Sequence, residues 1–395
     1  MEKVLIVMGC GLPVPAVKGG AVATLVESLL KINETEKQVK FYVFTLGNRD
    51  SEYISKQYHN TEFFNIHYHP ILLTLDKLIS SKGYLKKLYV IKEAMQYIKK
   101  NDFDAIILQN GGFLLKIFRN KKLLEKYKGK IFYHLHNDIP HNADRKVLKY
   151  CRFILISNYL IKGVVDLCGD KAKENCSIVK NGININKFSR TLNIEEKKQL
   201  REELKIKPEQ KILVFVGRIS PQKGIDKLLD AVKALNDTKI VLLVIGSTNF
   251  GMADCSPFEQ EIKQKCLEMK GQVRFTGFIH NDELWKYYQL ADIAVLPSMW
   301  EEPAGLTMIE AVASGTPVIS TISGGIPEYI SDNCGILVKR DSTIVQSLVE
   351  AIRNMLNHEN EWKKKVTIGK KEICQYYSEE TFYQHFINAC KSYDR

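Results

Sequence analysis

Residues 212–224 read ILVFVGRISPQKG, an apolar run of strand length followed at once by a glycine turn that carries an arginine and a lysine. Similar Val/Ile/Leu-rich runs recur along the chain and alternate with longer stretches of helical period. This alternation is typical of parallel sheets covered by helices, so the sequence predicts an α/β fold. We expect strands at residues 4–8, 40–45, 105–109, 130–134, 153–157, 212–216, 240–245, 273–275, 293–296 and 317–320.

These runs fall into two series, which indicates two doubly wound domains. At 395 residues the chain is longer than one hydrophobic core usually supports. The segment 181–188, NGININKF, has the composition of a turn and precedes a highly charged stretch. We therefore expect an N-terminal domain at residues 1–185, a second domain at 186–375 and a closing helix at 376–395.

The composition indicates a globular protein with an uneven charge distribution. Residues 1–185 hold 29 Lys+Arg against 17 Asp+Glu, whereas the remainder holds 28 of each, so the net charge of +12 lies in the first half. That half is expected to face an anionic partner. No run reaches the ~18 apolar residues of a membrane helix, and the first strand is too short for a signal segment. Nine cysteines without a C-x-x-C pattern favour reduced thiols, so we expect a cytoplasmic protein.

The strongest chemical signal is the segment 302–310, EPAGLTMIE, in which seven residues separate two carboxylates. Glu302 is expected in a loop after a strand, and Glu310 within the helix that follows. The free N–H groups and the dipole at the start of that helix can hold an anion such as a diphosphate. Carboxylates beside such an anion can accept hydrogen bonds from sugar and ribose hydroxyls. The alternative is that Glu302 caps the helix and Glu310 is a solvated surface charge.

The turn 217–224 is a second signal, because it places Arg218 and Lys223 just beyond a buried strand. Ligands of open α/β sheets usually bind at this carboxyl edge. Arginine can bind phosphate oxygens in a fork and lysine acts as a point charge, so the two can neutralise a diphosphate without a metal. The alternative is an ordinary surface turn that starts a helix at Pro221.

With these motifs the chain resembles, over nearly its full length, the retaining family 4 of GT-B glycosyltransferases, often called group 1. Arg218 and Lys223 match the family's Gly-Arg-x-x-x-x-Lys-Gly element, and Glu302 and Glu310 match its Glu-x7-Glu element. The resemblance implies two Rossmann-like domains that face a cleft, with a C-terminal helix that crosses back to the first domain. It also implies that Arg218 and Lys223 hold the donor diphosphate, that Glu302 faces the transferred sugar and that Glu310 binds ribose.

The resemblance extends to further positions of the donor site. Gly19 and Gly20 match the glycine loop of the family's N-domain, and Gly277 and Phe278 match its turn near the nucleobase. The donor-binding residues implied in this way are Gly19, Gly20, Arg218, Lys223, Gly277, Phe278, Glu302, Ala304, Gly305, Leu306, Thr307 and Glu310. The catalytic residues implied are His136, Glu302, Arg218 and Lys223.

Two assignments remain open between neighbouring residues. The segment 133–138, YHLHND, resembles the family segment that supplies an active-site histidine, and His136 is favoured over His134 or a purely structural role. The segment 300–305, WEEPAG, departs from the family's Tyr-Glu-Gly-Phe-Gly, so Glu301 or Glu302 meets the sugar. The spacing to the second carboxylate favours Glu302.

We expect no metal and no cofactor. Asp102 and Asp104 spell the D-x-D of metal-dependent transferases, but they stand between a helical run and a strand and are interpreted as a turn. The histidines of the first half should alternate faces on strands rather than converge on a metal.

The function implied by the resemblance is retaining, metal-independent hexosyl transfer in the synthesis of a cell-surface polysaccharide or glycoconjugate. The donor is a nucleotide-diphosphate sugar, with a UDP-sugar favoured, and the acceptor is a glycan or a lipid-linked molecule. The alternatives are a GT-B nucleotide-sugar epimerase and a catalytically silent scaffold that binds nucleotide sugars.

The segment 114–130, LLKIFRNKKLLEKYKGK, combines seven basic residues with one acidic residue and several apolar ones. Basic amphipathic segments of this kind bind anionic lipid, which would place the protein on the inner face of the membrane. The alternative is a segment that docks its apolar side chains on the sheet and leaves its lysines in water. Nucleic acid is not expected as a partner, because stacking aromatics do not alternate with the charges.

Overall fold

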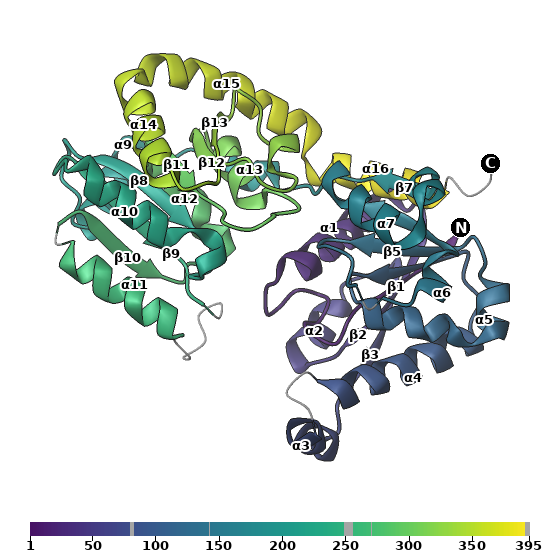
Figure 1. The fold of residues 1–395 in the computed structure, drawn as a ribbon. Coiled ribbons are helices and arrows are strands. Elements are labelled where there is room, and N and C mark those ends of the chain that lie inside the picture. Colours follow the sequence, from purple (N-terminus) through teal and green to yellow (C-terminus); the bar gives the residue numbers. More distant parts are fainter. Residues whose placement is uncertain (80–82, 142, 249–255, 270, 392–395) are drawn as a thin grey trace. The chain divides into compact units, whose positions relative to one another are not determined.

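The computed structural model describes residues 1–79, 83–141, 143–248, 256–269 and 271–391. The chain forms two compact units (Figure 1). Unit 1 comprises Met1–Gly182 together with helix α16 (Glu379–Lys391), and unit 2 comprises Ile183–Ser378. Each unit is a parallel sheet covered by helices, so the predicted α/β class is confirmed. None of the helices among the described residues is both long and apolar enough to cross a membrane.

The sheet of unit 1 has the order β3-β2-β1-β4-β5-β6-β7, and all its strands are parallel. The order reverses between β1 and β4, so the loops after these two strands leave at one switch point. The strands are β1 Lys3–Val7, β2 Lys40–Leu46, β3 Thr61–Ile66, β4 Ala105–Gln109, β5 Ile131–Leu135, β6 Cys151–Leu155 and β7 Cys176–Ile178. The helices are α1 Ala21–Glu36, α2 Arg49–Ser55, α3 Pro70–Ile79, α4 Tyr84–Lys100, α5 Lys121–Lys126, α6 Arg145–Leu148 and α7 Ile161–Cys168, with 3₁₀ segments η1 Gly112–Arg119, η2 Asn158–Leu160 and η3 Asp170–Asn175.

The sheet of unit 2 has the order β10-β9-β8-β11-β12-β13, again with parallel strands. Its order reverses between β8 and β11. The strands are β8 Lys211–Val216, β9 Ile240–Ile245, β10 Val273–Gly277, β11 Ile293–Leu296, β12 Val318–Thr321 and β13 Gly335–Val338. The helices are α8 Ile185–Phe188, α9 Ile194–Glu203, α10 Ile225–Leu235, α11 Pro257–Glu268, α12 Leu284–Leu290, α13 Leu306–Ala313, α14 Ile344–Asn357 and α15 Glu359–Tyr376, with 3₁₀ segments η4 Pro221–Lys223, η5 Asn281–Glu283 and η6 Ile326–Glu328.

The central strands of both sheets are buried on both faces, which explains their continuous apolar sequences. In unit 2, Leu213 and Phe215 of β8 belong to one core with Leu229 of α10 and Ile352 of α14. This core fixes the frame of the sheet, so the loops at the carboxyl ends of β8 and β11 start from rigid strands. All ten strands expected from the sequence are present, within a few residues at their ends.

Three of the described strands were not predicted, and all three are edge strands of their sheets. β3 and β13 are edge strands, and β7 closes the other edge of the first sheet with only three residues. Edge strands are less buried and need no apolar run. Glu62 and Asn65 interrupt β3 accordingly, and its sequence therefore lacks the pattern that identified the inner strands.

Helix α16 closes unit 1 by packing on α1. The Tyr383 hydroxyl donates to Asn33 Oδ1 at 2.7 Å, and Asn33 Nδ2 donates to the carbonyl of Val39 at 2.8 Å. Both side chains are fully buried. The helix begins at Glu379 and not at the predicted residue 376, because α15 continues to Tyr376. Residues 392–395 of the predicted closing segment lie outside the described residues.

The hydrogen bond from Tyr383 gives a stability test for unit 1. Tyr383→Phe leaves the buried Asn33 Oδ1 without its main donor, so we expect the free energy of unfolding to fall by about 1–2 kcal/mol. Tyr376→Phe, at an exposed site on α15, should change it by less than ~0.5 kcal/mol. Urea denaturation of both variants measures the difference, and equal stabilities would contradict the role given to this contact.

Candidate functional site

The loops after β8 and β11 meet at the carboxyl edge of the unit 2 sheet, at the point where the strand order reverses. The Lys223 ammonium lies 2.8 Å from Glu302 Oε1 and 2.7 Å from Oε2. The Trp300 indole N–H and the Ser298 hydroxyl each donate to Glu302 Oε2 at 3.1 Å. These bonds fix the position of the Glu302 carboxylate. It lies between Lys223 from the loop after β8 and the donors Ser298 and Trp300 from the loop after β11.

The neighbouring carboxylate, Glu301, has different partners. It pairs with Arg340 and accepts the backbone N–H of Gly324. Gly324 has a φ of +53°, and a Cβ there would come within 2.2 Å of the Glu302 carbonyl oxygen. Only glycine therefore fits this close approach. Of the two adjacent carboxylates, Glu302 is thus the one that shares an ion pair with Lys223.

The first turn of α13 lies directly after this loop. Its N-cap residue is Gly305, which has no side chain to bond the first N–H groups. Leu306 and Thr307 begin the helix, so their N–H groups have no carbonyl partner within it. Glu302 accepts from Lys223, Trp300 and Ser298 and does not cap the helix, so that alternative is wrong.

Glu310, the second carboxylate, lies inside α13 and is buried, so the alternative of a solvated surface charge is also wrong. It accepts a hydrogen bond from Asn281 Nδ2 at 3.2 Å and one from the Tyr288 hydroxyl at 3.4 Å. Lys187 in turn donates to Asn281 Oδ1. Burial raises the pKa of Glu310 to about 7, although the two hydrogen bonds and the charge of Lys187 act in the opposite direction.

Arg218 and Phe278 lie on the surface of unit 2. Arg218 is exposed, and within the described part of the chain no carboxylate pairs with it, so its guanidinium is available to a ligand. Phe278 is also exposed and follows Gly277, whose φ of +75° ends β10 in a turn. The structure thus brings Lys223 and Glu302 into contact. Among the described residues, neither Arg218 nor Phe278 forms a hydrogen bond with either of them.

The predicted residues of the first half belong to unit 1. Gly19 and Gly20 have φ values of +68° and +95° and lead directly into α1, at the switch point between β1 and β4. His136 follows β5. Its ring Nε2 lies 3.0 Å from Gln109 Oε1 at the end of β4, and its backbone N–H donates to Asn110 Oδ1 at 3.0 Å.

Both candidate histidines are buried, and their rings lie 4.1 Å apart between centroids. Burial lowers the pKa of His136 to about 3, and burial together with His136 holds the pKa of His134 well below its usual value. Both rings are therefore neutral near pH 7. His134 lies within β5 and contacts Phe386 of α16, whereas His136 lies beyond the strand end. Of the two histidines, His136 is therefore the one beyond the carboxyl end of β5.

Asp102 and Asp104 occupy the turn between α4 and β4, as predicted. Asp102 pairs with Lys126, and Asp104 Oδ2 accepts the backbone N–H of Lys3 at 2.9 Å. Among the described residues, no group of three or more His, Cys, Asp or Glu side chains is arranged to hold a metal ion.

The basic segment 114–130 docks its apolar side chains inside unit 1, so the prediction that these side chains face lipid is wrong. Leu114, Leu115, Phe118 and Leu123 are buried. The segment forms η1 and α5, and its lysines remain on the surface. The segment therefore follows the alternative interpretation: its apolar side chains pack inside unit 1 and its lysines face water.

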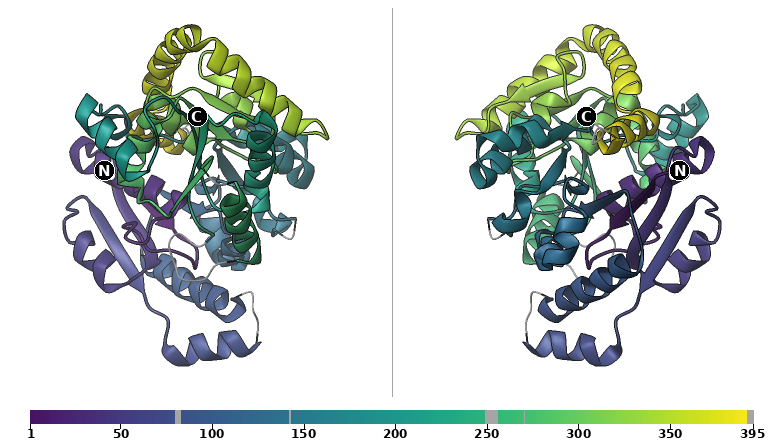
Figure 2. Two further views of the ribbon diagram at one scale, coloured as in Figure 1. Left: turned by 90° about the vertical axis from the view of Figure 1, so that its left-hand side faces the viewer. Right: turned by 90° about the vertical axis from the view of Figure 1, so that its right-hand side faces the viewer.

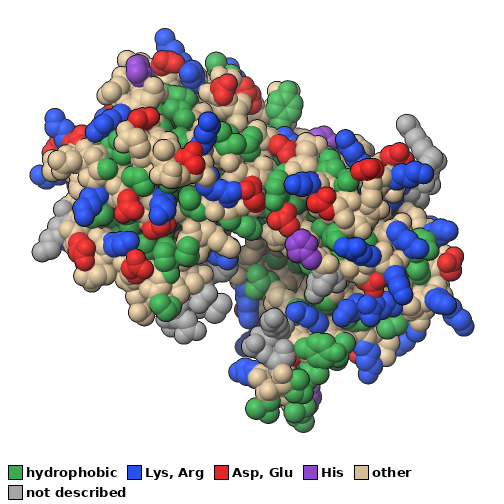
Figure 3. Space-filling model, viewed as in Figure 1, with side chains coloured by type: hydrophobic (Ala, Val, Ile, Leu, Met, Phe, Trp, Pro, Cys, Tyr) green, Lys and Arg blue, Asp and Glu red, His purple; other side chains and the backbone are tan. Residues whose placement is uncertain are grey.

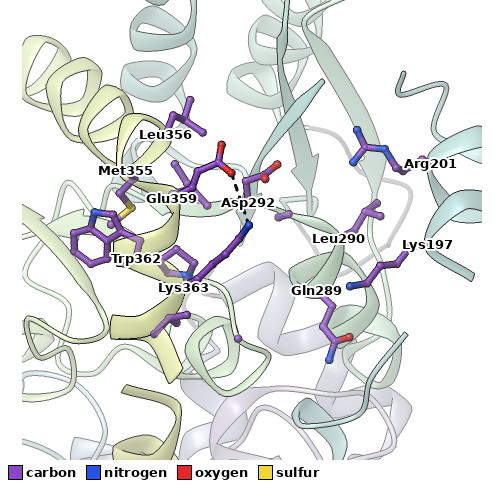
Figure 4. A pocket seen from close by; sticks show the side chains of 15 residues that line it. Lys197, Arg201, Gln289, Leu290, Asp292, Met355, Leu356, Glu359, Trp362 and Lys363 are labelled. Atoms are coloured by element: carbon purple, nitrogen blue, oxygen red, sulfur yellow. Dashed lines mark ion pairs between the residues drawn. The ribbon is translucent and has the colours of Figure 1, made fainter. Parts of the chain in front are cut away.

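A separate pocket of about 310 Å³ lies at the amino ends of strands β11 and β12 in unit 2 (Figure 4). Asp292 and Pro317, which precede β11 and β12, line it together with Trp362 and Lys363 of α15. Because it opens at the amino ends of these strands, it is distinct from the carboxyl edge that carries Lys223 and Glu302.

Unit 2 is similar to a known protein family. Residues 196–372 match the family Glycosyl transferases group 1. The match lies within unit 2 and covers less than half of the chain. The match includes the segments that carry Lys223 and Glu302 and the helix that carries Glu310.

Similar proteins match much of the chain. An uncharacterized glycosyltransferase of Methanocaldococcus jannaschii is 29% identical over 61% of this chain and 60% of its own length. Alpha-monoglucosyldiacylglycerol synthase of Streptococcus pneumoniae is 28% identical over 86% of this chain and 76% of its own. The crystal structure of HepE from Anabaena in complex with UDP has a TM-score of 0.74 at 19% identity, over 99% of this chain and 100% of that chain. This likeness establishes the GT-B fold of the two units.

Sequence reasoning missed the residues that support the two carboxylates. Ser298 and Trp300 stand next to the Glu302 motif, and their proximity in sequence could have indicated a role. Asn281, Tyr288 and Lys187 come from segments far from Glu310 in sequence. Only the folded sheet brings them to its side chain, so no local pattern could have found them.

The raised pKa of Glu310 gives a pH test. Between about pH 5 and 7 the native carboxyl holds a proton that the unfolded chain releases, so the free energy of unfolding should fall as pH rises. We expect a fall of roughly 1–3 kcal/mol, and Glu310→Gln should abolish this slope. The control, exposed Glu350→Gln on α14, should keep it. Chemical denaturation across this range measures the slopes, and a wild-type slope in Glu310→Gln would contradict the assignment.

Proposed function

We propose that the chain is a retaining, metal-independent hexosyltransferase that transfers a sugar from a nucleotide-diphosphate sugar, with a UDP-sugar favoured. The acceptor is a glycan or a lipid-linked molecule in the synthesis of a cell-surface polysaccharide or glycoconjugate. The observation that carries the proposal is the contact between Lys223 and Glu302 beside the uncapped start of α13. HepE, which shares the fold, was solved in complex with UDP.

The donor diphosphate would bind beside Lys223 and the free N–H groups of Leu306 and Thr307. A helix start favours an anion, because its N–H groups and dipole point toward the ligand. Arg218 adds a second cation whose side chain has no carboxylate partner among the described residues. Lys223 would then contact both the diphosphate and Glu302, which leaves the Glu302 carboxylate oriented toward the sugar hydroxyls.

The nucleoside would lie toward Phe278 and Glu310. An exposed aromatic ring offers a stacking surface for a base. Glu310 accepts from Asn281 and Tyr288, and these two side chains fix its orientation toward ribose hydroxyls. Ala304 and Gly305 offer backbone without bulky side chains between the sugar and phosphate positions.

The reaction would be a front-face transfer. The acceptor oxygen bonds to the anomeric carbon on the face from which the diphosphate leaves, the bond from that carbon to the phosphate oxygen breaks, and the acceptor proton moves to the departing phosphate. Arg218, Lys223 and the α13 amides stabilise the charge that develops on the leaving group. His136, neutral because of its burial, would orient the sugar or polarise a hydroxyl, and Gly19 and Gly20 would let the unit 1 backbone approach the donor.

Removal of either cation tests the donor site. Arg218→Ala or Lys223→Ala should lower turnover by roughly two orders of magnitude or more, the effect of losing a charge-stabilising donor at a leaving group. Turnover can be followed as slow hydrolysis of UDP-, GDP- and ADP-sugars without acceptor. The control Lys233→Ala changes an exposed lysine of α10 and should retain full activity. If both site variants turned over the donor as fast as the wild type, the donor site could not lie at the carboxyl edge of the unit 2 sheet. If the wild type hydrolysed none of the donors, a scaffold that only binds nucleotide sugars would be favoured.

Removal of divalent metals tests the electrostatic part of the mechanism. Because protein cations take the place of a metal in the proposal, activity should be unchanged in EDTA. The assay is the same hydrolysis reaction after dialysis against chelator. A strict requirement for Mg²⁺ or Mn²⁺ would show that the two cations and the helix amides do not suffice.

A further inference from the structure

Helix α3 presents an apolar face to solvent. Ile71, Leu75, Leu78 and Ile79 fall on one side of the helix, at spacings of four, three and one residues. Their exposed fractions are 64%, 45%, 77% and 63%. Tyr84 and Leu88, in the first turns of α4, are exposed as well. Hydrophobic side chains gather at this end of unit 1 (Figure 3), and single exposed apolar residues are common whereas a cluster marks an interaction site.

Helix α3 is fixed in its position by a buried carboxylate. Asp76 Oδ1 accepts the backbone N–H of Leu85 at 2.7 Å and that of Lys86 at 3.4 Å, so it caps α4. The N-cap residue of α4, Gly83, has no side chain for this purpose. In both side views α3 stands outermost, beyond α4 (Figure 2). The apolar face is therefore an ordered feature that points away from the body of unit 1.

The charges beside this face are basic. Residues 70–100 contain seven lysines and two acidic residues, and one of the latter is the buried Asp76. Lys77 on α3 and Lys92 on α4 are exposed, and Lys87 is partly exposed. A second copy docked face to face would place these lysines against their counterparts, at the cost of like-charge repulsion. An anionic lipid surface instead satisfies both the apolar side chains and the lysines.

We propose that α3, with the start of α4, is a docking element for an anionic membrane surface. Ile71, Leu75, Leu78 and Ile79 enter the boundary between headgroups and acyl chains, and Lys77, Lys87 and Lys92 lie among the phosphates. The helix of 10 residues is about 15 Å long, so it lies in the interface and does not cross it. This inference concerns where the protein works and does not depend on the donor chemistry of unit 2.

Vesicle co-sedimentation with the full chain tests the proposal. Wild-type protein should bind vesicles of equal parts phosphatidylglycerol and phosphatidylcholine, bind pure phosphatidylcholine much more weakly, and lose affinity as salt increases. Leu78→Ser/Ile79→Ser should weaken binding to the anionic vesicles roughly tenfold or more, because two large apolar side chains no longer leave water.

A matched control is available in unit 2. Ile194→Ser/Leu267→Ser removes two apolar side chains of similar exposure, 88% and 67%, and should bind the vesicles as the wild type does. On the segment 114–130, Lys121→Gln/Lys122→Gln removes two exposed lysines and should have a smaller effect than Lys77→Gln/Lys87→Gln. Circular dichroism verifies that each variant is folded.

Several results would overturn the proposal. These are a wild type that does not bind anionic vesicles, equal binding to neutral vesicles, and a Leu78→Ser/Ile79→Ser variant that binds like the wild type. Analytical ultracentrifugation without lipid tests whether a second copy of the chain binds this face. If the wild type is a dimer and the Leu78→Ser/Ile79→Ser variant is a monomer, the face belongs to a dimer interface. Because the vesicles contain neither donor nor acceptor, these results are independent of glycosyl transfer.

Discussion

The reversal of strand order between β8 and β11 is the constraint on which the proposed site depends. At that point the connections after two adjacent strands leave the same carboxyl edge toward opposite sides of the sheet. The ion pair between Lys223 and Glu302 forms there. Gly324 then allows the Glu302 backbone to approach the loop after β12. The geometry of the two motifs therefore follows from the topology of the sheet, not from the motifs alone.

Electrostatics differ between the two carboxylates of unit 2. Glu302 is paired with a lysine, whereas Glu310 is buried among neutral donors, and burial raises its pKa to about 7. In unit 1, burial keeps His136 neutral near pH 7. The proposed enzyme thus combines a charged region for the phosphates with less polar surroundings for ribose and sugar.

The sequence predicted the inner strands, the α/β class and the two motif segments, because buried parallel strands and glycine turns leave strong local patterns. Three edge strands were not predicted: polar residues interrupt β3, and β7 and β13 are only three and four residues long. The hydrogen-bond partners of Glu310 were not predicted because they are distant from it in sequence. The interpretation of residues 114–130 as lipid-facing failed for a related reason: amphipathicity shows that a segment has an apolar face, whereas only the fold shows that η1 and α5 bury it and that α3 does not.

Hydrogen–deuterium exchange of the full chain, with and without saturating UDP, GDP or ADP, tests the central claim most directly because it locates the ligand without an acceptor. At least one nucleotide should protect the backbone amides of residues 217–224 and 299–307, while amides around the pocket of Asp292 and Trp362, at the amino edge of the same sheet, exchange unchanged. Protection confined to that pocket, or no protection by any of the three nucleotides, would contradict the assignment of the donor site to the β8 and β11 loops.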